Sequence, residues 1–260
     1  MSSVTDRIKE IKQPRGGYIK PSSMNLIELN DEKVLNEQEN VSGAIIGMVV
    51  DYMKRFMMGA KITKAFEISI LGATLAKKIL KRNTTKELNK YLLGIQGLDD
   101  TSIINACKAV TFDVWYRNPM AAMLAKGAAE TNPDKDTIEN IRIIIERSLS
   151  FWKEYGPIKV DGFTFEEKGY TNTVDSGDGD FLTEDTLWDF KVSKSTPRSD
   201  HTLQLIMYYI MGKHSEKPEF NGIQKIGIFN PRLNRIYQLD IKSVPAEIIE
   251  TIEKDVICYE

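Results

Sequence analysis

The spacing of apolar residues changes at residue 157, and this change constrains the fold more than any other feature of the chain. Before it, apolar side chains recur every three or four positions, as in the stripe from Ile45 to Phe56, which is typical of amphipathic helices. After it, residues 158–160 and 163–165 alternate around an Asp161-Gly162 turn, which predicts a β-hairpin. Helices followed by strands favour an α+β fold with a helical region in front of the sheet.

The remaining elements follow from the same patterns. After a first helix that begins at Ser42, further helices are predicted near residues 61–82, 84–94, 101–117, 119–130, 136–155, 200–211 and 244–256. Strands are predicted near residues 178–182, 187–193, 223–229 and 234–240. Gly212 stands where the C-terminal cap of the helix 200–211 is expected.

Three segments are expected along the chain. Residues 1–40 are polar and interrupted by turns, so we expect a loose N-terminal arm with a short strand or helix at Met24–Leu29. Residues 41–156 form a helical region that contributes one helix to the core. Residues 157–260 form the core itself, with the mixed pattern of strands and helices.

Composition excludes several classes of protein. The 260 residues carry 35 Lys and Arg against 37 Asp and Glu, a net charge of −2, so a strongly basic nucleic-acid coat is excluded. Two His and two Cys are too few for a His-rich metal centre, a four-Cys zinc site or an iron–sulfur cluster. A bilayer span needs about 20 apolar residues, and no apolar run is that long. With no secretory signal at the start, we expect a cytoplasmic protein with reduced Cys107 and Cys258.

The segment 177–191 predicts a second hairpin, centred on Glu184 and Asp185. In that register Leu182 faces Leu187 and Phe181 faces Trp188. One residue further from the turn, Asp180 faces Asp189, and alternation places both acids and Lys191 on one face of the hairpin. The aromatic residues then lie on the opposite face, which is the one expected to be buried.

Two opposed carboxylates favour a bound cation. Directly opposed residues have Cβ atoms roughly 4.5–5.5 Å apart, where like charges destabilise a sheet. Oxygen ligands without nearby His or Cys favour Mg²⁺ or Mn²⁺ over Zn²⁺, and such a centre suits phosphodiester hydrolysis, with Lys191 orienting the attacking water. The alternative is that Asp180 belongs to an ordinary turn and that Lys191 pairs across the strands with Asp178.

The predicted helix 200–211 adds a second pair of polar residues. Gln204 and Tyr208 are four positions apart and share one face, where both could hydrogen-bond a phosphate or a base. The alternative is that Tyr208 packs in the core. His201 and His214 fall at the ends of this helix and are not expected to be metal ligands.

Together these elements resemble the PD-(D/E)XK nuclease superfamily, and within it the RecB-like exonuclease branch. That branch has GxxD, DxK and QxxxY elements in this order, which here are Gly177 to Asp180, Asp189 to Lys191, and Gln204 to Tyr208, within residues 167–240. The resemblance implies an α/β/α restriction-endonuclease-like core, with a mixed sheet flanked by helices. It also implies a Mg²⁺- or Mn²⁺-dependent enzyme that hydrolyses DNA, more often from an end than internally. Asp180 and Asp189 would be metal ligands, Lys191 the catalytic cation, and Gln204 and Tyr208 substrate-positioning residues.

The chain departs from the family in one element. Relatives carry a GxxxH helix whose His is a metal ligand, whereas this chain has no His before His201. The nearest counterpart runs from Gly47 to Asp51, so Asp51 is a candidate further ligand; the alternative is that it pairs with Lys54 or Arg55. Some relatives hold an iron–sulfur cluster with four Cys, and none is expected here because there are two.

Local charge points to a nucleic-acid partner. Residues 187–242 hold nine Lys and Arg against five Asp and Glu, a local balance of +4, opposite in sign to the whole chain. We expect Lys194 and Arg198 to contact phosphates, with DNA rather than RNA as the substrate and no membrane partner. A protein partner or a homo-oligomer stays open. The alternative function is a non-catalytic nucleic-acid-binding or protein-interaction module on the same fold.

Overall fold

The computed structural model describes residues 2–260, which form two compact units. The first unit combines the N-terminal residues up to Asn30 with Phe151–Glu260, and the second is Asp31–Ser150. This division differs from the expected one, which placed residues 1–40 in a separate arm and the later boundary at residue 156. The N-terminal 30 residues belong to the sheet-containing unit.

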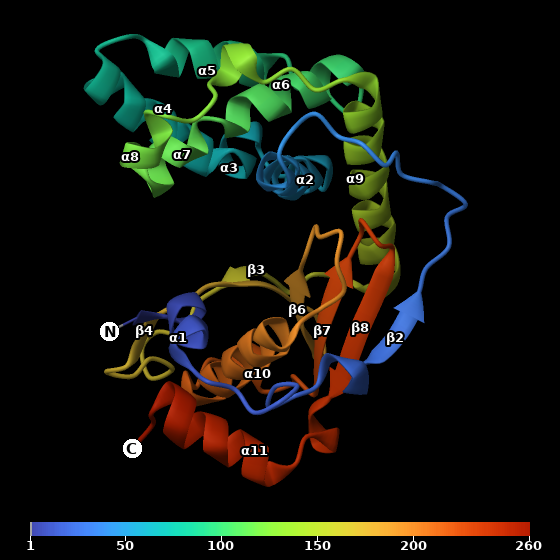
Figure 1. Cartoon of the computed structure of the whole chain (residues 1–260), viewed down its shortest axis with the longest axis vertical. Coiled ribbons are helices and arrows are strands. Elements are labelled where there is room, and N and C mark those ends of the chain that lie inside the picture. Colours follow the sequence, from blue (N-terminus) through green and yellow to red (C-terminus); the bar gives the residue numbers. More distant parts are fainter. Residues whose placement is uncertain (1) are drawn as a thin grey trace. The chain divides into compact units, whose positions relative to one another are not determined.

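A six-stranded mixed sheet forms the centre of the first unit (Figure 1). Its strand order is β2-β8-β7-β6-β5-β3, and β6 and β7 are parallel while the other neighbours are antiparallel. The bounds are β2 Asn25–Glu28, β3 Val160–Phe163, β5 Gly179–Leu182, β6 Thr186–Phe190, β7 Lys225–Asn230 and β8 Arg235–Asp240. Two short strands, β1 Ser2–Ser3 and β4 Val174–Ser176, pair in parallel as a separate ribbon. The mixed α+β class predicted from the sequence is confirmed.

The expectation of a loose N-terminal arm is wrong for residues 2–28, whereas residues 31–40 carry no helix or strand. Helix α1 (Val4–Glu10) starts at Ser3, whose hydroxyl accepts the N–H of Asp6. Where a short strand or helix was expected at Met24–Leu29, the structure has the strand β2, which forms the edge of the sheet against β8. Val4, Ile19 and Met24 are buried in the main core. The sequence did not indicate that these residues are buried, because each is a single apolar residue in a polar segment and they have no regular spacing.

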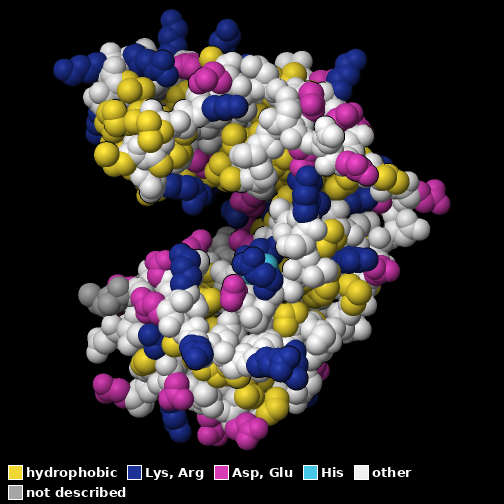
Figure 2. Space-filling view, in the orientation of Figure 1, with side chains coloured by type: hydrophobic (Ala, Val, Ile, Leu, Met, Phe, Trp, Pro, Cys, Tyr) yellow, Lys and Arg dark blue, Asp and Glu magenta, His cyan; other side chains and the backbone are white. Residues whose placement is uncertain are grey.

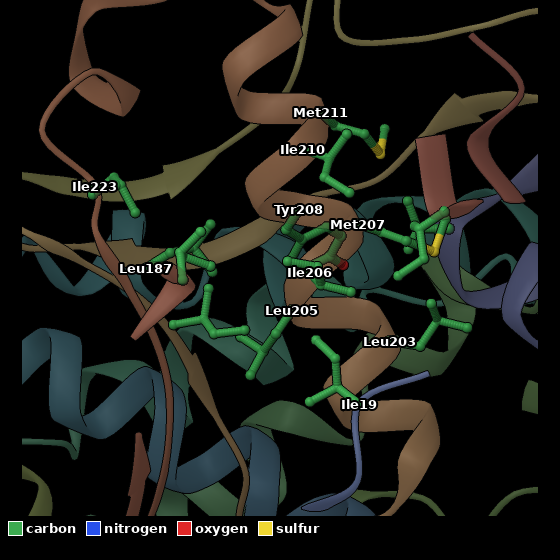
Figure 3. Packing of buried hydrophobic residues seen from close by; sticks show 14 of the residues in the cluster. Ile19, Leu187, Leu203, Leu205, Ile206, Met207, Tyr208, Ile210, Met211 and Ile223 are labelled. Atoms are coloured by element: carbon green, nitrogen blue, oxygen red, sulfur yellow. The ribbon is translucent and has the colours of Figure 1, made fainter. Parts of the chain in front are cut away.

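Helix α10 (Ser199–His214) covers one face of the sheet with side chains that are buried almost all round (Figure 3). Its residues pack with Leu182 and Leu187 of the hairpin, both fully buried. This face of the hairpin is therefore buried as well, whereas the sequence predicted burial of the aromatic face alone. The predicted cap at Gly212 is also wrong, since the helix continues to His214 and ends at Ser215.

The opposite face of the sheet carries an aromatic cluster. Phe181 and Trp188, 1% and 2% exposed, pack with Phe151 and Trp152 in the last five residues of helix α9, which belong to this unit. Phe151 stacks on Phe229 with ring centroids 4.0 Å apart and planes 6° apart. The aromatic face of the hairpin is thus buried, as predicted. The unit ends in α11 (Ala246–Thr251) and a π-helical turn at Ile252–Ile257, close to the predicted last helix.

The second unit is helical, as predicted, but it consists of more and shorter helices than the sequence predicted. Its helices are α2 Gly43–Met57, α3 Ile62–Ala65, α4 Glu67–Leu80, α5 Thr84–Leu93, α6 Asp100–Val110, α7 Asp113–Arg117, α8 Pro119–Ala122 and most of α9 Lys135–Tyr155. Polar caps begin several of them: Ser42, Asn83 and Asp99 each accept a backbone N–H from the first turn. Within residues 2–260 we find no helix that combines the length and the apolar character needed to cross a membrane.

Two helical glycines in this unit are expected to respond in opposite ways to alanine. A Cβ at Gly72 of α4 would lie 1.9 Å from the backbone oxygen of Phe112, next to α7, whereas a Cβ at Gly47 of α2 meets nothing within 4 Å. We expect Gly72→Ala to cost about 1–3 kcal/mol of unfolding free energy through overpacking. Gly47→Ala should instead gain about 0.5–1 kcal/mol, because alanine favours the helix. Urea unfolding of both variants checks this, and equal effects would contradict the close approach of α4 and α7.

Candidate active site

The hairpin predicted for residues 177–191 and its register are confirmed, whereas the one predicted around Asp161-Gly162 is not formed, because residues 160–163 are the single strand β3. Phe181 pairs with Trp188 and Leu182 with Leu187, and the turn closes with the N–H of Thr183 donating to the carbonyl oxygen of Thr186 at 3.0 Å. The paired residues end at Phe181 and Trp188, and Asp180 and Asp189 are the next residues of β5 and β6. The Oδ2 of Asp180 accepts the backbone N–H of Phe190 at 2.7 Å, which fixes this carboxylate across the end of β6.

Asp189 carries the most unusual atom of the site. The residue is 5% exposed, and its Oδ1 lies 3.0 Å from the ammonium of Lys191. Its Oδ2 is buried and has no hydrogen-bond partner within residues 2–260. A buried carboxylate oxygen without a donor is costly, because burial removes the water that would solvate its charge. Asp189 therefore has one satisfied oxygen and one that still needs a positive partner.

Lys191 connects the hairpin to helix α10. Its Nζ donates to Gln204 Oε1 at 3.2 Å, and Gln204 Nε2 donates to the hydroxyl oxygen of Tyr208 at 2.9 Å. The predicted shared face of Gln204 and Tyr208 is thus confirmed, and contacts run from Asp189 through Lys191 and Gln204 to Tyr208. The alternative pair of Lys191 with Asp178 is not formed within the described chain, residues 2–260.

Tyr208 serves both the core and the site. It is 4% exposed and packs with the main core, as the alternative interpretation expected. Burial raises the pKa of its hydroxyl, and the negative charges of Asp189, Asp178 and Asp180 raise it further, while the hydrogen bond from Gln204 opposes them. The phenol therefore stays protonated at neutral pH and keeps a proton to donate.

Lys194 and Arg198 lie in the connection between β6 and α10, and both are exposed. Arg198 has a carboxylate oxygen of Asp200 3.5 Å from its guanidinium. The connection follows Lys191 and ends at the start of α10. Both cations therefore lie in the chain between Lys191 and the helix that carries Gln204 and Tyr208. Their role as phosphate contacts stays a prediction.

Asp51 lies on α2 in the second unit, where it forms two ion pairs. Its Oδ1 is 3.0 Å from Lys54 Nζ and 3.3 Å from Arg55 Nε, so the pairs named by the alternative interpretation are present. Burial raises the pKa of Asp51, and the charges of Lys54 and Arg55 outweigh it, so the pKa is lowered overall. Its role as a further metal ligand stays a prediction.

The donor set of the hairpin fits a hard divalent ion. Asp180 and Asp189 supply carboxylate oxygens, and the unpaired Oδ2 of Asp189 is the kind of atom such an ion would satisfy. No group of three or more His, Cys, Asp or Glu side chains arranged to hold a metal occurs in residues 2–260. A bound ion would therefore complete its coordination with water or substrate oxygens, as Mg²⁺ commonly does.

His201 lies beside the site, although its place at the helix end gave no reason to single it out. It occupies the first turn of α10, three and seven residues before Gln204 and Tyr208, and its Nδ1 accepts the N–H of Arg198 at 3.3 Å. Burial lowers the pKa of His201 from 6.5, and the positive charge of Lys191 lowers it further, against the opposing charge of Asp189. The spacing with Gln204 and Tyr208 is the sequence signal that could have identified it.

The titration of His201 gives a direct measure of this proximity. A folded pKa below 6.5 means that the stability contribution of the neutral ring is present above pH 6.5 and lost as the pH falls through the folded pKa. NMR titration should place His201 below 6.5, and Lys191→Ala should raise its pKa. His214→Gln assigns the signals, because the chain has two His. A His201 pKa above 6.5, or one indifferent to Lys191→Ala, would contradict the placement.

Comparison of this chain with protein families, with curated proteins and with solved structures gave no match.

Proposed function

We propose that this chain is a Mg²⁺- or Mn²⁺-dependent nuclease that hydrolyses phosphodiester bonds of DNA on a restriction-endonuclease-like core. The observation that carries the proposal is the buried, unpaired Oδ2 of Asp189 beside the Lys191 ammonium, with Asp180 fixed across the hairpin. The exonucleolytic mode rests on the resemblance to the RecB-like branch.

Asp180 and Asp189 would hold the metal ion. When bound there, a divalent ion neutralises charge at the scissile phosphate and acidifies a water molecule. The protein positions both carboxylates before any ligand arrives. Asp180 is held by the Phe190 N–H, and Asp189 by Lys191 and by its place in β6, the strand between β5 and β7. Such preorganisation means that little reorganisation is needed during the reaction.

The substrate would be bound and oriented by Lys191, Gln204 and Tyr208. The ammonium of Lys191 bridges Asp189 and Gln204, which keeps it next to the carboxylates and able to stabilise the negative charge that develops on the phosphate. Gln204 and Tyr208 support Lys191 from α10 and offer hydrogen bonds to phosphate oxygens. The parallel pairing of β6 and β7 explains the arrangement, because α10 is the crossover between these strands and starts directly after the loop that follows Lys191.

A cleavage assay tests the proposal. End-labelled linear DNA and covalently closed circular DNA are incubated with the protein in Mn²⁺, in Mg²⁺ and in EDTA. We expect metal-dependent release of short products from the linear substrate, with the closed circle left intact. Cutting of the circle would show an endonuclease instead. Metal-independent cleavage, or none in any condition, would contradict the proposal and favour the non-catalytic module.

A further inference from the structure

We infer that the N-terminal segment 11–23 forms, with the loop 190–199, a single surface that binds the phosphodiester backbone of a DNA strand. This inference rests on the proposed function and extends it to the N-terminal segment. Three features of the first unit support it. The segment lies against the start of α10, its three exposed cations have no ion-pair partner in residues 2–260, and a cavity opens beside it.

Three contacts hold the N-terminal segment against the first turn of α10, which directly follows the loop. The hydroxyl of Thr202, in α10, donates to the carbonyl oxygen of Ile19 at 2.6 Å in a buried position. Gln13 Nε2 donates to Asp200 Oδ1 at 3.3 Å. Gly17 has φ +93°, and a Cβ there would lie 2.5 Å from Ser199 Cβ, so the backbone approaches α10 as closely as it does because residue 17 is glycine.

The charges of both segments have one sign. Residues 11–27 contain Lys12, Arg15 and Lys20 and no acidic residue. Residues 190–199 contain three further cations, of which Lys191 pairs with Asp189 and Arg198 with Asp200, the acids on either side of this range. Lys12, Arg15 and Lys20 are exposed, and none has an ion-pair or side-chain hydrogen-bond partner in residues 2–260. Cations that neutralise no carboxylate of their own protein are available to neutralise phosphates. Figure 2 shows Lys and Arg side chains over the face of this unit that carries α10 and the N-terminal segment in Figure 1.

A cavity of about 460 Å³ opens where the two segments meet. Lys20 and Ser22 line it from the N-terminal segment, and Thr196 lines it from the loop. Tyr237 of β8 also lines it, with a buried hydroxyl that has no hydrogen-bond partner within residues 2–260. Amines and hydroxyls are the side-chain groups that proteins use to contact phosphate and sugar oxygens. Because the loop starts at the DxK element, a strand bound along this surface would lead to the candidate active site.

The test measures DNA binding without cleavage. A fluorescein-labelled single-stranded oligodeoxynucleotide is titrated in EDTA at several salt concentrations with the whole protein and with the triple variant Lys12→Gln/Arg15→Gln/Lys20→Gln. The control is Lys153→Gln/Lys168→Gln/Lys254→Gln, which removes the same charge from exposed lysines elsewhere in the unit. Each lost phosphate contact on a single strand lowers the slope of log K against log salt by about 0.7. We therefore expect a slope lower by about 2 in the first variant and unchanged in the control.

Three results would overturn the inference: a slope in the first variant equal to that of the unchanged protein, an equal loss in both variants, or no DNA binding by the unchanged protein. If the protein bound an RNA strand but no DNA strand, the inference would be wrong about the ligand. The outcome is separate from that of the cleavage assay. Binding that depends on the segment without metal-dependent cleavage contradicts the nuclease, whereas cleavage with an unaltered slope contradicts the role of the segment.

Discussion

Asp189→Ala is expected to lower the rate of DNA cleavage by about 10³-fold or more, equivalent to about 4 kcal/mol of transition-state stabilisation. The reason is that Asp189 supplies one of two opposed carboxylates and contacts the candidate catalytic lysine at 3.0 Å. Lys191→Ala should cost about 10²–10³-fold, the range for loss of one preorganised charge-stabilising group. Initial rates on end-labelled linear DNA in Mn²⁺ measure both effects.

Asp185→Ala is the matched control for this prediction. Asp185 lies in the turn of the same hairpin, but its carboxylate pairs with Lys225 at 2.9 Å and is 42% exposed. Removal of this acid should leave the cleavage rate close to that of the unchanged protein. If Asp189→Ala and Asp185→Ala lost activity equally, the effect would come from damage to the hairpin rather than from the site. If neither lost activity, the assignment of Asp189 would be wrong.

Phe151→Ala is expected to lower the free energy of unfolding of the first unit by about 3–5 kcal/mol. Phe151 is 1% exposed, stacks on Phe229 and meets Trp188 edge-to-face with centroids 5.0 Å apart. Truncation would remove these aromatic contacts and leave a cavity against the hairpin that carries the site. Urea unfolding followed by tryptophan fluorescence measures the loss, because Trp152 and Trp188 lie in the same cluster.

Tyr116→Ala removes an aromatic ring of similar size from an exposed position in the second unit, where 51% of the residue is accessible. It should change the unfolding free energy by less than about 0.5 kcal/mol, as surface substitutions usually do. A cost for Phe151→Ala as small as that for Tyr116→Ala would contradict the packing of α9 on the sheet.

The hairpin was predictable because its alternation leaves one acceptable register. A shift by one residue would take Phe181 and Trp188 out of the aromatic cluster and put charged residues in their place, so the pairing follows from the sequence alone. The same holds for Gln204 and Tyr208, whose spacing fixes a shared helical face. These local rules were sufficient to bring the site together.

Other parts depend on contacts that a local pattern does not encode. The N-terminal segment joins the sheet through β2 and through a few isolated apolar residues such as Ile19, which have no period. The burial of Leu187 and Leu182 depends on α10 covering that face. Gly212 lies inside α10 rather than at its cap, and its glycine allows a close tertiary contact, since a Cβ there would lie 2.2 Å from the ring of Phe220.

Binding of Mn²⁺ tests the central claim most directly, because the buried Oδ2 of Asp189 needs a positive partner. Crystals of the protein soaked in Mn²⁺ are measured at the manganese edge, beside crystals of Asp189→Asn, which keeps the size of the side chain and removes its charge. We predict an anomalous peak in contact with the carboxylates of Asp180 and Asp189, and its loss in the variant. A peak that persists in Asp189→Asn, or no manganese near these two residues, would contradict the claim.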